Sequence, residues 1–292
     1  MLKKIFSTLI FLITLSFSAQ TKGVVLDSIS GKPIAYVNIW VENENIGTTS
    51  EENGEFSIGS TEKNKKLIFS ILGFEKKIIQ ISEAKLVKLK PIAYQLDEIV
   101  LSRRKDTKQI EIGNNKDVIF EAFENGPKID IKFFPYVAAY KKTKYIKRVT
   151  LFTDCRIENT TVKIHFYSAD ANGFPGEEIL NKDLIVTLKK GTVKNRIDVT
   201  AFDLKMPKQG LFVGFEKLMI EKNKIEKAST DPSTKKVTVH KTFSPYVFYN
   251  YVERSVLYTF SGGKWKQQSA NTTNISGKTK GYEPAINLIL TN

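Results

Sequence analysis

The sequence has 292 residues, of which 41% are hydrophobic and 26% charged, and its formal net charge is +14. This length exceeds the usual size of one domain, so we expect two domains. Cys155 is the only cysteine, which excludes an intramolecular disulfide and leaves core burial to hold each domain together. We expect Cys155 to be a buried, inert thiol; a functional thiol is the alternative, although no histidine and base pattern nearby would activate it.

Residues 1–19 have the features of a signal peptide. Lys3 and Lys4 provide the positive start, and Ile5 to Phe17 form an apolar run that ends in small residues. The apolar run is shorter than the roughly 20 residues that a membrane-spanning helix needs. We therefore predict cleavage near Ala19, export, and no transmembrane segment after cleavage. An uncleaved N-terminal anchor is the alternative.

The stretch from Gly23 to Ile58 predicts a β-meander with polar turns between its strands. Gly31 can adopt a positive φ in the first turn, and Pro33 suits the start of the next strand. The pair Asn53-Gly54 is typical of a tight hairpin turn, because both central positions of such a turn need a positive φ. The predicted strands are Val24 to Leu26, Ala35 to Val41 and Glu55 to Ile58.

The order of these motifs resembles the carboxypeptidase-regulatory-like family, a small transthyretin-like β-sandwich. The residues that carry the resemblance are Gly23, Val25, Asp27, Gly31, Pro33, Ile34, Gly47, Thr48, Ser50, Asn53, Gly54, Phe56 and Ile58. The likeness continues through Leu67 to Phe74 and Val87 to Ser102, so it covers residues 20–102. Despite its name, the family implies an accessory sandwich domain and brings no peptidase residues with it.

The same resemblance points to the cell envelope. A tail like Val87 to Ser102 is found before the plug of TonB-dependent receptors in the outer membrane of gram-negative bacteria. Only 190 residues follow Ser102, which are too few for the plug and the transmembrane part of a receptor of that class. We therefore do not expect a transporter. The predicted location is the periplasm, the outer membrane or the cell surface.

Residues 103–130 are predicted to be a linker, because they begin with a run of charged residues and end near Gly126-Pro127. Within them, Asp117 to Asn125 fits a short helix or a strand. The net charge also changes here: residues 20–101 hold 10 lysines and 11 acidic residues, whereas residues 102–292 carry +13. A basic surface can attract anionic partners, but export argues against nucleic acid, and solubility is a sufficient reason for scattered lysines.

Residues 131–292 contain short strands separated by turns, which predicts a second antiparallel β-sandwich of the jelly-roll type. The whole chain is therefore expected to be all-β. On one strand, Val162, Ile164 and Phe166 share one face, and the polar neighbours between them share the other. The expected strands are Phe133 to Tyr140, Ile146 to Asp154, Thr161 to Tyr167, Asp183 to Leu188, Val193 to Asp198, Gly210 to Ile220, Tyr246 to Asn250, Val256 to Phe260, Lys264 to Gln267 and Ile286 to Leu290.

The sequence predicts no metal site and no cofactor. His165 and His240 are the only histidines, and neither has a partner at ligand spacing, so exposed strand positions are expected for both. The loop from Asp170 to Glu178 offers oxygen ligands of the kind calcium takes, but it lacks a defined calcium motif. We expect it to be a plain hairpin loop, with a calcium site as the alternative.

Aromatic residues provide the candidate binding site of the second domain. Tyr246, Tyr249 and Tyr251 lie in one aromatic run, and Trp265 follows a Gly-Gly turn. Aromatic faces stack on sugar rings, and tyrosine hydroxyl groups add hydrogen bonds, so these four residues are candidates for glycan binding. The alternative is that they fill the core, because strands are generally rich in aromatic residues.

No catalytic motif of a serine hydrolase or a zinc peptidase is present, and no pair of carboxylates stands out, so we do not expect an enzyme. Two hypotheses remain. The first is an exported, non-catalytic interaction or accessory protein of the cell envelope, built from two β-sandwich modules. The second is a carbohydrate-binding module in the C-terminal sandwich. Its partner would be an envelope protein or a glycan.

Overall fold

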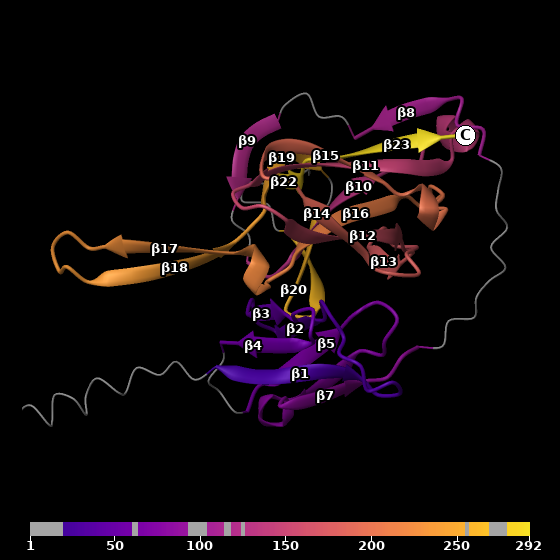
Figure 1. The fold of residues 1–292 in the computed structure, drawn as a ribbon. Coiled ribbons are helices and arrows are strands. Elements are labelled where there is room, and N and C mark those ends of the chain that lie inside the picture. The colour runs from indigo at the N-terminus through magenta and orange to yellow at the C-terminus, as the bar shows by residue number, and fades with distance from the viewer. Residues whose placement is uncertain are drawn as a thin grey trace, which may run out of the picture.

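The structure is a computed structural model, and it describes residues 20–59, 64–92, 104–113, 118–123, 126–254, 257–268 and 279–292. The predicted signal peptide, residues 1–19, lies outside the described residues. The fold is all-β, with two sandwich domains stacked one on the other (Figure 1). Among the described residues, no helix is long and apolar enough to cross a membrane.

The N-terminal domain is a sandwich of two small sheets. The three-stranded sheet has the order β4-β1-β7, in which β1 and β7 run parallel. The four-stranded sheet has the order β3-β2-β5-β6 and is antiparallel. The strands are β1 (Thr21–Asp27), β2 (Asn38–Val41), β3 (Gly47–Thr49), β4 (Glu55–Ile58), β5 (Lys66–Ser70), β6 (Lys77–Gln80) and β7 (Leu86–Leu89).

This arrangement confirms the sandwich that the family resemblance implied and corrects the predicted meander. Strand β1 pairs with β4 and β7, whereas β2 pairs with β3 and β5, so the three strands of the predicted meander, β1, β2 and β4, are divided between two sheets. The turn before β4 matches the prediction at Gly54, where φ is +77°, but not at Asn53, which lacks the positive φ that the predicted tight hairpin turn needs at both central residues. A Cβ at Gly54 would lie 2.6 Å from the carbonyl oxygen of Val25, so this turn needs glycine for space as well.

The C-terminal domain contains two seven-stranded sheets. One sheet has the order β13-β12-β16-β10-β20-β21, with β14 also on β12. The other has the order β22-β19-β11-β23-β8, with β15 on β11 and β9 on β19. The strands are β8 (Gln109–Ile112), β9 (Val118–Phe123), β10 (Ile129–Phe134), β11 (Tyr145–Cys155), β12 (Thr160–Ala169), β13 (Pro175–Glu178), β14 (Leu184–Leu188), β15 (Gly191–Asp198), β16 (Leu211–Lys217), β19 (Tyr246–Arg254), β20 (Tyr258–Ser261), β21 (Lys264–Gln267), β22 (Thr279–Pro284) and β23 (Ile286–Thr291).

The two large sheets enclose the main hydrophobic core. Val162, Ile164 and Phe166 of β12 point into it from one sheet, as their alternation predicted. Leu151 and Cys155 of β11 point into it from the other sheet. The prediction of a buried thiol is confirmed, since Cys155 is 1% exposed and burial raises its pKa above the ordinary value for a thiol.

The predicted linker is part of the second domain instead. Strand β8 pairs with β23 and strand β9 pairs with β19, so residues 109–112 and 118–123 extend a sheet of the sandwich. Because both strands are short, the neighbouring run of charged residues favoured the prediction of a linker. The long strand expected for Phe133 to Tyr140 is also shorter, because it ends at Phe134 and a short 3-10 turn follows at Ala138–Lys142.

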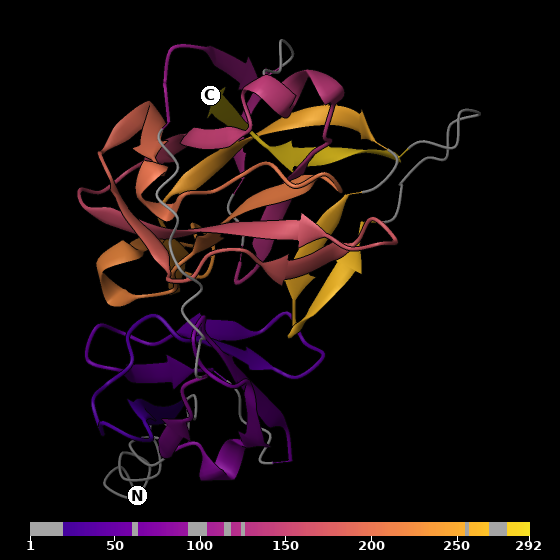
Figure 2. The same cartoon turned by 90° about the vertical axis from the view of Figure 1, so that its right-hand side faces the viewer.

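The two domains are packed sheet against sheet, as the view in Figure 2 shows. Strand β2 is buried along its whole length: Ile39 and Val41 face the N-terminal core, whereas Asn38 and Trp40 contact the other domain. Strand β12 is buried on both faces for the same reason. The polar face of the second sandwich is therefore covered by the first domain, and this is where the candidate site lies.

Candidate ligand site between the two domains

Strand β12 presents Lys163, His165 and Tyr167 to the N-terminal domain. Their alternation with the core residues was predicted, but their burial was not. His165 is 5% exposed, so the prediction of an exposed strand position for this residue was wrong. The reason is that a second domain covers the face that would otherwise meet water. His240, in contrast, is exposed, as expected.

His165 lies between two carboxylates. Its Nδ1 is 2.8 Å from Oε2 of Glu178, and its Nε2 is 2.9 Å from Oε2 of Glu216. Burial alone would lower the pKa of His165, but the charges and hydrogen bonds of both glutamates outweigh it and raise the pKa to about 9. His165 is therefore an imidazolium at neutral pH and donates from both ring nitrogens.

Two side chains tie this cluster to the N-terminal domain. The Nδ2 of Asn38 donates to Oε2 of Glu216 at 2.9 Å. The Nζ of Lys163 donates to the backbone carbonyl of Tyr36 at 3.1 Å, and it also lies 3.4 Å from Oδ1 of Asp183. Because Lys163 is only 1% exposed, these contacts neutralise a charge that would be costly to bury alone.

Further contacts surround the cluster and fix the domains together. Trp40 packs edge-on against Phe260, with ring centroids 6.0 Å apart. The amide of Met219 donates to Oγ1 of Thr49 at 3.0 Å. Asn45 accepts bonds of 3.1 Å from both Ser261 and Lys266. The interface thus combines an aromatic contact with charged and polar pairs.

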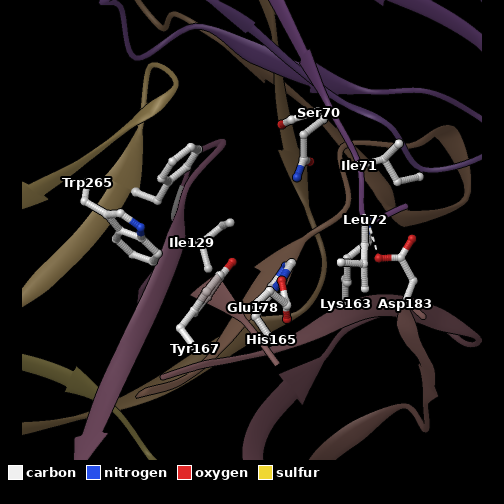
Figure 3. A pocket seen from close by; sticks show the side chains of 12 residues that line it. Ser70, Ile71, Leu72, Ile129, Lys163, His165, Tyr167, Glu178, Asp183 and Trp265 are labelled. Carbon is white, nitrogen blue, oxygen red and sulfur yellow. Dashed lines mark hydrogen bonds and ion pairs between the residues drawn. The ribbon is translucent and has the colours of Figure 1, made fainter. Parts of the chain in front are cut away.

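A cavity of about 240 Å³ opens beside this cluster, and both domains line it. Figure 3 shows Trp265 and Tyr167 on one side, Lys163 and Asp183 on the other, and Ser70 above. Trp265 meets the ring of Tyr167 edge-on at 5.1 Å. The lining residues are Asn38, Ser70, Ile71, Leu72, Ile129, Lys163, His165, Tyr167, Glu178, Asp183, Phe260 and Trp265.

Several polar atoms of the lining keep unused hydrogen-bonding capacity. Only Oδ1 of Asp183 is engaged, by Lys163, and only Nδ2 of Asn38 is engaged, by Glu216. Neither Asp183 Oδ2, Asn38 Oδ1 nor the hydroxyl of Ser70 is bonded to any residue that the structure describes. Burial, together with the nearby carboxylates, raises the pKa of Tyr167 well above its ordinary value, so this hydroxyl keeps its proton.

The charges around the cavity nearly cancel. Three carboxylates, from Glu178, Asp183 and Glu216, face the two cations Lys163 and His165. One negative charge is left over. The cavity therefore suits a neutral ligand that can donate hydrogen bonds, and it disfavours an anion.

The structure places the four predicted glycan-binding residues in separate environments. Tyr249 lies in the main core, and its hydroxyl donates to Asp130 at 2.6 Å. Tyr246 is buried under the guanidinium group of Arg156, and Tyr251 is exposed beside Tyr282. Trp265 alone lines the cavity. The four do not form one face, and glycan binding through any of them stays a prediction.

The geometry offers little to a metal ion. The carboxylates of Glu178 and Glu216 bond opposite nitrogens of His165, so the three groups do not converge on one point. No group of three metal-ligating side chains is found among the described residues. In the loop considered for calcium, Oδ1 of Asp170 accepts from the amides of Asn172 and Phe174, as in a plain turn, while Glu178 points back to His165.

Reasoning from the sequence missed this site, although one pattern could have indicated it. The face of β12 that carries Lys163, His165 and Tyr167 lies beside Glu216 on β16, which pairs with Lys163 across the sheet. On the other domain, β2 reads Asn-Ile-Trp-Val and has no charged residue. In a small sandwich, a strand that has no charged side chain on either face is expected to be covered on both faces.

Comparisons with known proteins identify the first domain. Residues 21–101 match the family model of the CarboxypepD_reg-like domain, which confirms the resemblance. A search of curated proteins found no match.

Two solved structures show only a distant likeness. A clostridial cysteine protease, Cwp84, after propeptide cleavage is 10% identical, with a TM-score of 0.33, and the match covers 88% of this chain and 65% of that chain. A structure of infectious bursal disease virus, Gx strain, is 10% identical, with a TM-score of 0.17, and the match covers 93% and 60%. The chain thus spans less than two thirds of both structures, and likenesses this weak carry no argument about function.

Proposed function

We propose that this chain, whose N-terminal domain is a CarboxypepD_reg-like domain, is an exported, non-catalytic accessory protein of the cell envelope that binds a small neutral carbohydrate between its two domains. The observation that carries the proposal is the shared cavity of about 240 Å³. Its wall combines the aromatic side chains of Trp265 and Tyr167 with polar atoms of Asn38, Ser70 and Asp183 that are bonded to no residue the structure describes.

Size and shape restrict the ligand. Pockets for drug-sized molecules start at roughly 300 Å³, so this cavity suits a smaller molecule, of about one sugar ring. A sugar has an apolar face that can lie against Trp265, and hydroxyl groups that can donate to Asp183 Oδ2 and Asn38 Oδ1. The remaining negative charge of the lining favours a neutral sugar over an acidic one.

A non-catalytic role is supported by how the ionisable groups are used. Both ring nitrogens of His165 are bonded to carboxylates, so the imidazole has no free atom to serve as a base. Glu178 is held further by the amide of Phe166, which donates to its Oε1 at 3.0 Å. These groups act as a structural cluster that orients the cavity wall.

An envelope location is supported by the domain family, which is typical of extracytoplasmic proteins. One part of the interaction hypothesis changes, namely the docking of the N-terminal domain on an envelope protein. The N-terminal domain uses its β2 and β5 face to hold the second domain, so that face is not available to dock on an envelope protein. In this proposal the first domain completes a ligand site instead of acting as a separate adaptor.

The test is calorimetric titration of residues 20–292 with neutral monosaccharides and with glucuronate, at low and high salt. We expect saturable binding of a neutral sugar that survives high salt, because the contacts are hydrogen bonds and aromatic packing. Trp265→Ala and Asp183→Asn should each weaken binding about tenfold. Tyr251→Ala is the matched control, since Tyr251 lies outside the cavity. No binding of any neutral sugar would contradict the proposal.

A further inference from the structure

Strands β17 (Lys224–Thr230) and β18 (Val237–Phe243) form a hairpin that extends away from both domains (Figure 1). The two strands make a sheet of their own and pair over seven residues each. Bonds near its base anchor the hairpin, for example between Oγ1 of Thr242 and the hydroxyl of Tyr246. Beyond the base, every residue from 226 to 241 is exposed.

A hairpin of this kind is incomplete by itself. Two-stranded sheets are marginally stable in water, and their outer edges present unpaired backbone groups. Among the described residues, no other strand pairs with β17 or β18. The edge of β18 is rich in β-branched residues, with Val237, Thr238 and Val239 in sequence, which favours an extended conformation.

The two faces of the hairpin differ in chemistry. Ala228 is paired with Val239, and Thr230 with Val237, so these four residues share one face. Val237 and Val239 are 59% and 51% exposed, which is unusual for two neighbouring valines on one face. The opposite face is polar and includes Lys227 and His240.

The hairpin is also basic. From Lys224 to Phe243 it contains five lysines and two acidic residues, which gives a net charge of +3. Lys224 and Lys241 are paired with Glu226. The other three lysines, at positions 227, 235 and 236, form no ion pair with any residue that the structure describes. The free positive charge therefore lies toward the tip.

We propose that β18 receives an added strand from an acidic partner protein. The partner segment would be extended and would alternate apolar residues, which contact Val237 and Val239, with acidic residues on the face of Lys227 and His240. Strand addition satisfies the free backbone groups of the edge, and alternate side chains give specificity. A second copy of this chain is disfavoured as the occupant, because two hairpins of charge +3 would repel each other.

The test uses a defined peptide with the full mature chain. An acetylated, amidated peptide of sequence Thr-Glu-Val-Glu-Val-Glu-Thr matches the length of β18, and the same peptide with lysine in place of glutamate is its control. Binding is followed by the NMR shifts of the backbone amides. We expect saturable binding of the acidic peptide, with shifts confined to β17 and β18, and at least tenfold weaker binding of the basic peptide.

Three double variants separate the contributions of charge and of apolar contact. Lys227→Glu with Lys236→Glu should weaken the acidic peptide at least tenfold, whereas the matched change at two exposed lysines elsewhere, Lys190→Glu with Lys208→Glu, should not. Val237→Ser with Val239→Ser should weaken it several-fold at unchanged charge. All six positions are exposed, so the unfolding temperature should stay the same.

Three results would overturn the proposal. The first is equal affinity for both peptides, and the second is equal weakening by the two lysine pairs. The third is binding of the chain to phosphatidylglycerol vesicles without binding of the acidic peptide, which would assign the hairpin to a lipid surface. Sugar binding between the domains does not enter this test, so it can fail independently of the proposed function.

Discussion

The side-chain amide of Asn38 donates to the carboxylate of Glu216 at 2.9 Å, and the two residues belong to different domains. The same carboxylate oxygen lies 2.9 Å from Nε2 of His165. One glutamate therefore connects the outward face of β2 to the buried face of β12. Because Glu216 is 3% exposed, both contacts are needed to offset the cost of burying its charge.

Asn38→Asp should destabilise the protein strongly. The change replaces a donor with a second carboxylate beside Glu216, in a position that is 7% exposed. We expect a loss of about 3 kcal/mol in the free energy of unfolding, measured by urea denaturation at pH 7. The control is Asn172→Asp, in an exposed loop, which should change stability by less than about 0.5 kcal/mol. Equal effects of the two changes would contradict the role of this interdomain bond.

The stability of the chain should fall as the pH rises from about 6.5 to 9. The pKa of His165 is about 9 in the folded protein and near 6.5 in the unfolded chain, so its contribution is complete below pH 6.5. It is lost as the pH passes through the folded value. A shift of this size corresponds to about 3 kcal/mol. His165→Gln should be less stable by a similar amount at pH 6 and should lose most of this pH dependence. A variant with the wild-type slope would show that another group titrates.

The thiol of Cys155 should be inert in the native protein. It is buried in the main core, and burial raises its pKa, so little thiolate is present at neutral pH. A thiol reagent such as dithiobis(nitrobenzoate) should label one group per chain in urea and almost none in buffer over an hour. Complete labelling of the folded protein within minutes would contradict this packing.

Tyr249→Phe should lower stability and leave sugar binding unchanged. The hydroxyl of Tyr249 donates to the buried carboxylate of Asp130 at 2.6 Å, and neither residue lines the cavity. Removing a hydrogen bond to a buried charge costs about 2 kcal/mol. Thermal denaturation measures the loss, and calorimetric titration measures the sugar. A large fall in sugar affinity at unchanged stability would return Tyr249 to the set of binding residues.

The sequence predicted the sandwich architecture and one wall of its core well. Alternation placed Val162, Ile164 and Phe166 on a buried face, and the motif from Gly23 to Ile58 identified the family of the first domain. These features depend on local chemistry, namely strand period and turn residues. Strand β8 was not predicted, and β9 was only one of two alternatives for its stretch, because their partners β23 and β19 are distant in the sequence.

The site was less predictable than the fold. Alternation shows that Lys163 and His165 share a face, but it does not show what covers that face. Asn38 and Ser70 come from a domain that is linked to the cluster only through tertiary packing. Trp265 was found as an aromatic after a turn, whereas its partners in the cavity depend on how two sheets meet. A single sequence contains no direct record of such contacts.

The most direct test of a sugar site built by both domains is a substitution in the first domain that blocks sugar binding in the shared cavity. Ser70 lies at the end of β5 and lines the cavity from the N-terminal side. In residues 20–292, Ser70→Phe should abolish calorimetric binding of the neutral sugar, because the new ring would fill the space beside Asn38. Ser57→Phe, at an exposed position of β4, is the control and should bind as the wild type does. Unchanged sugar affinity in Ser70→Phe would contradict a ligand site built by both domains.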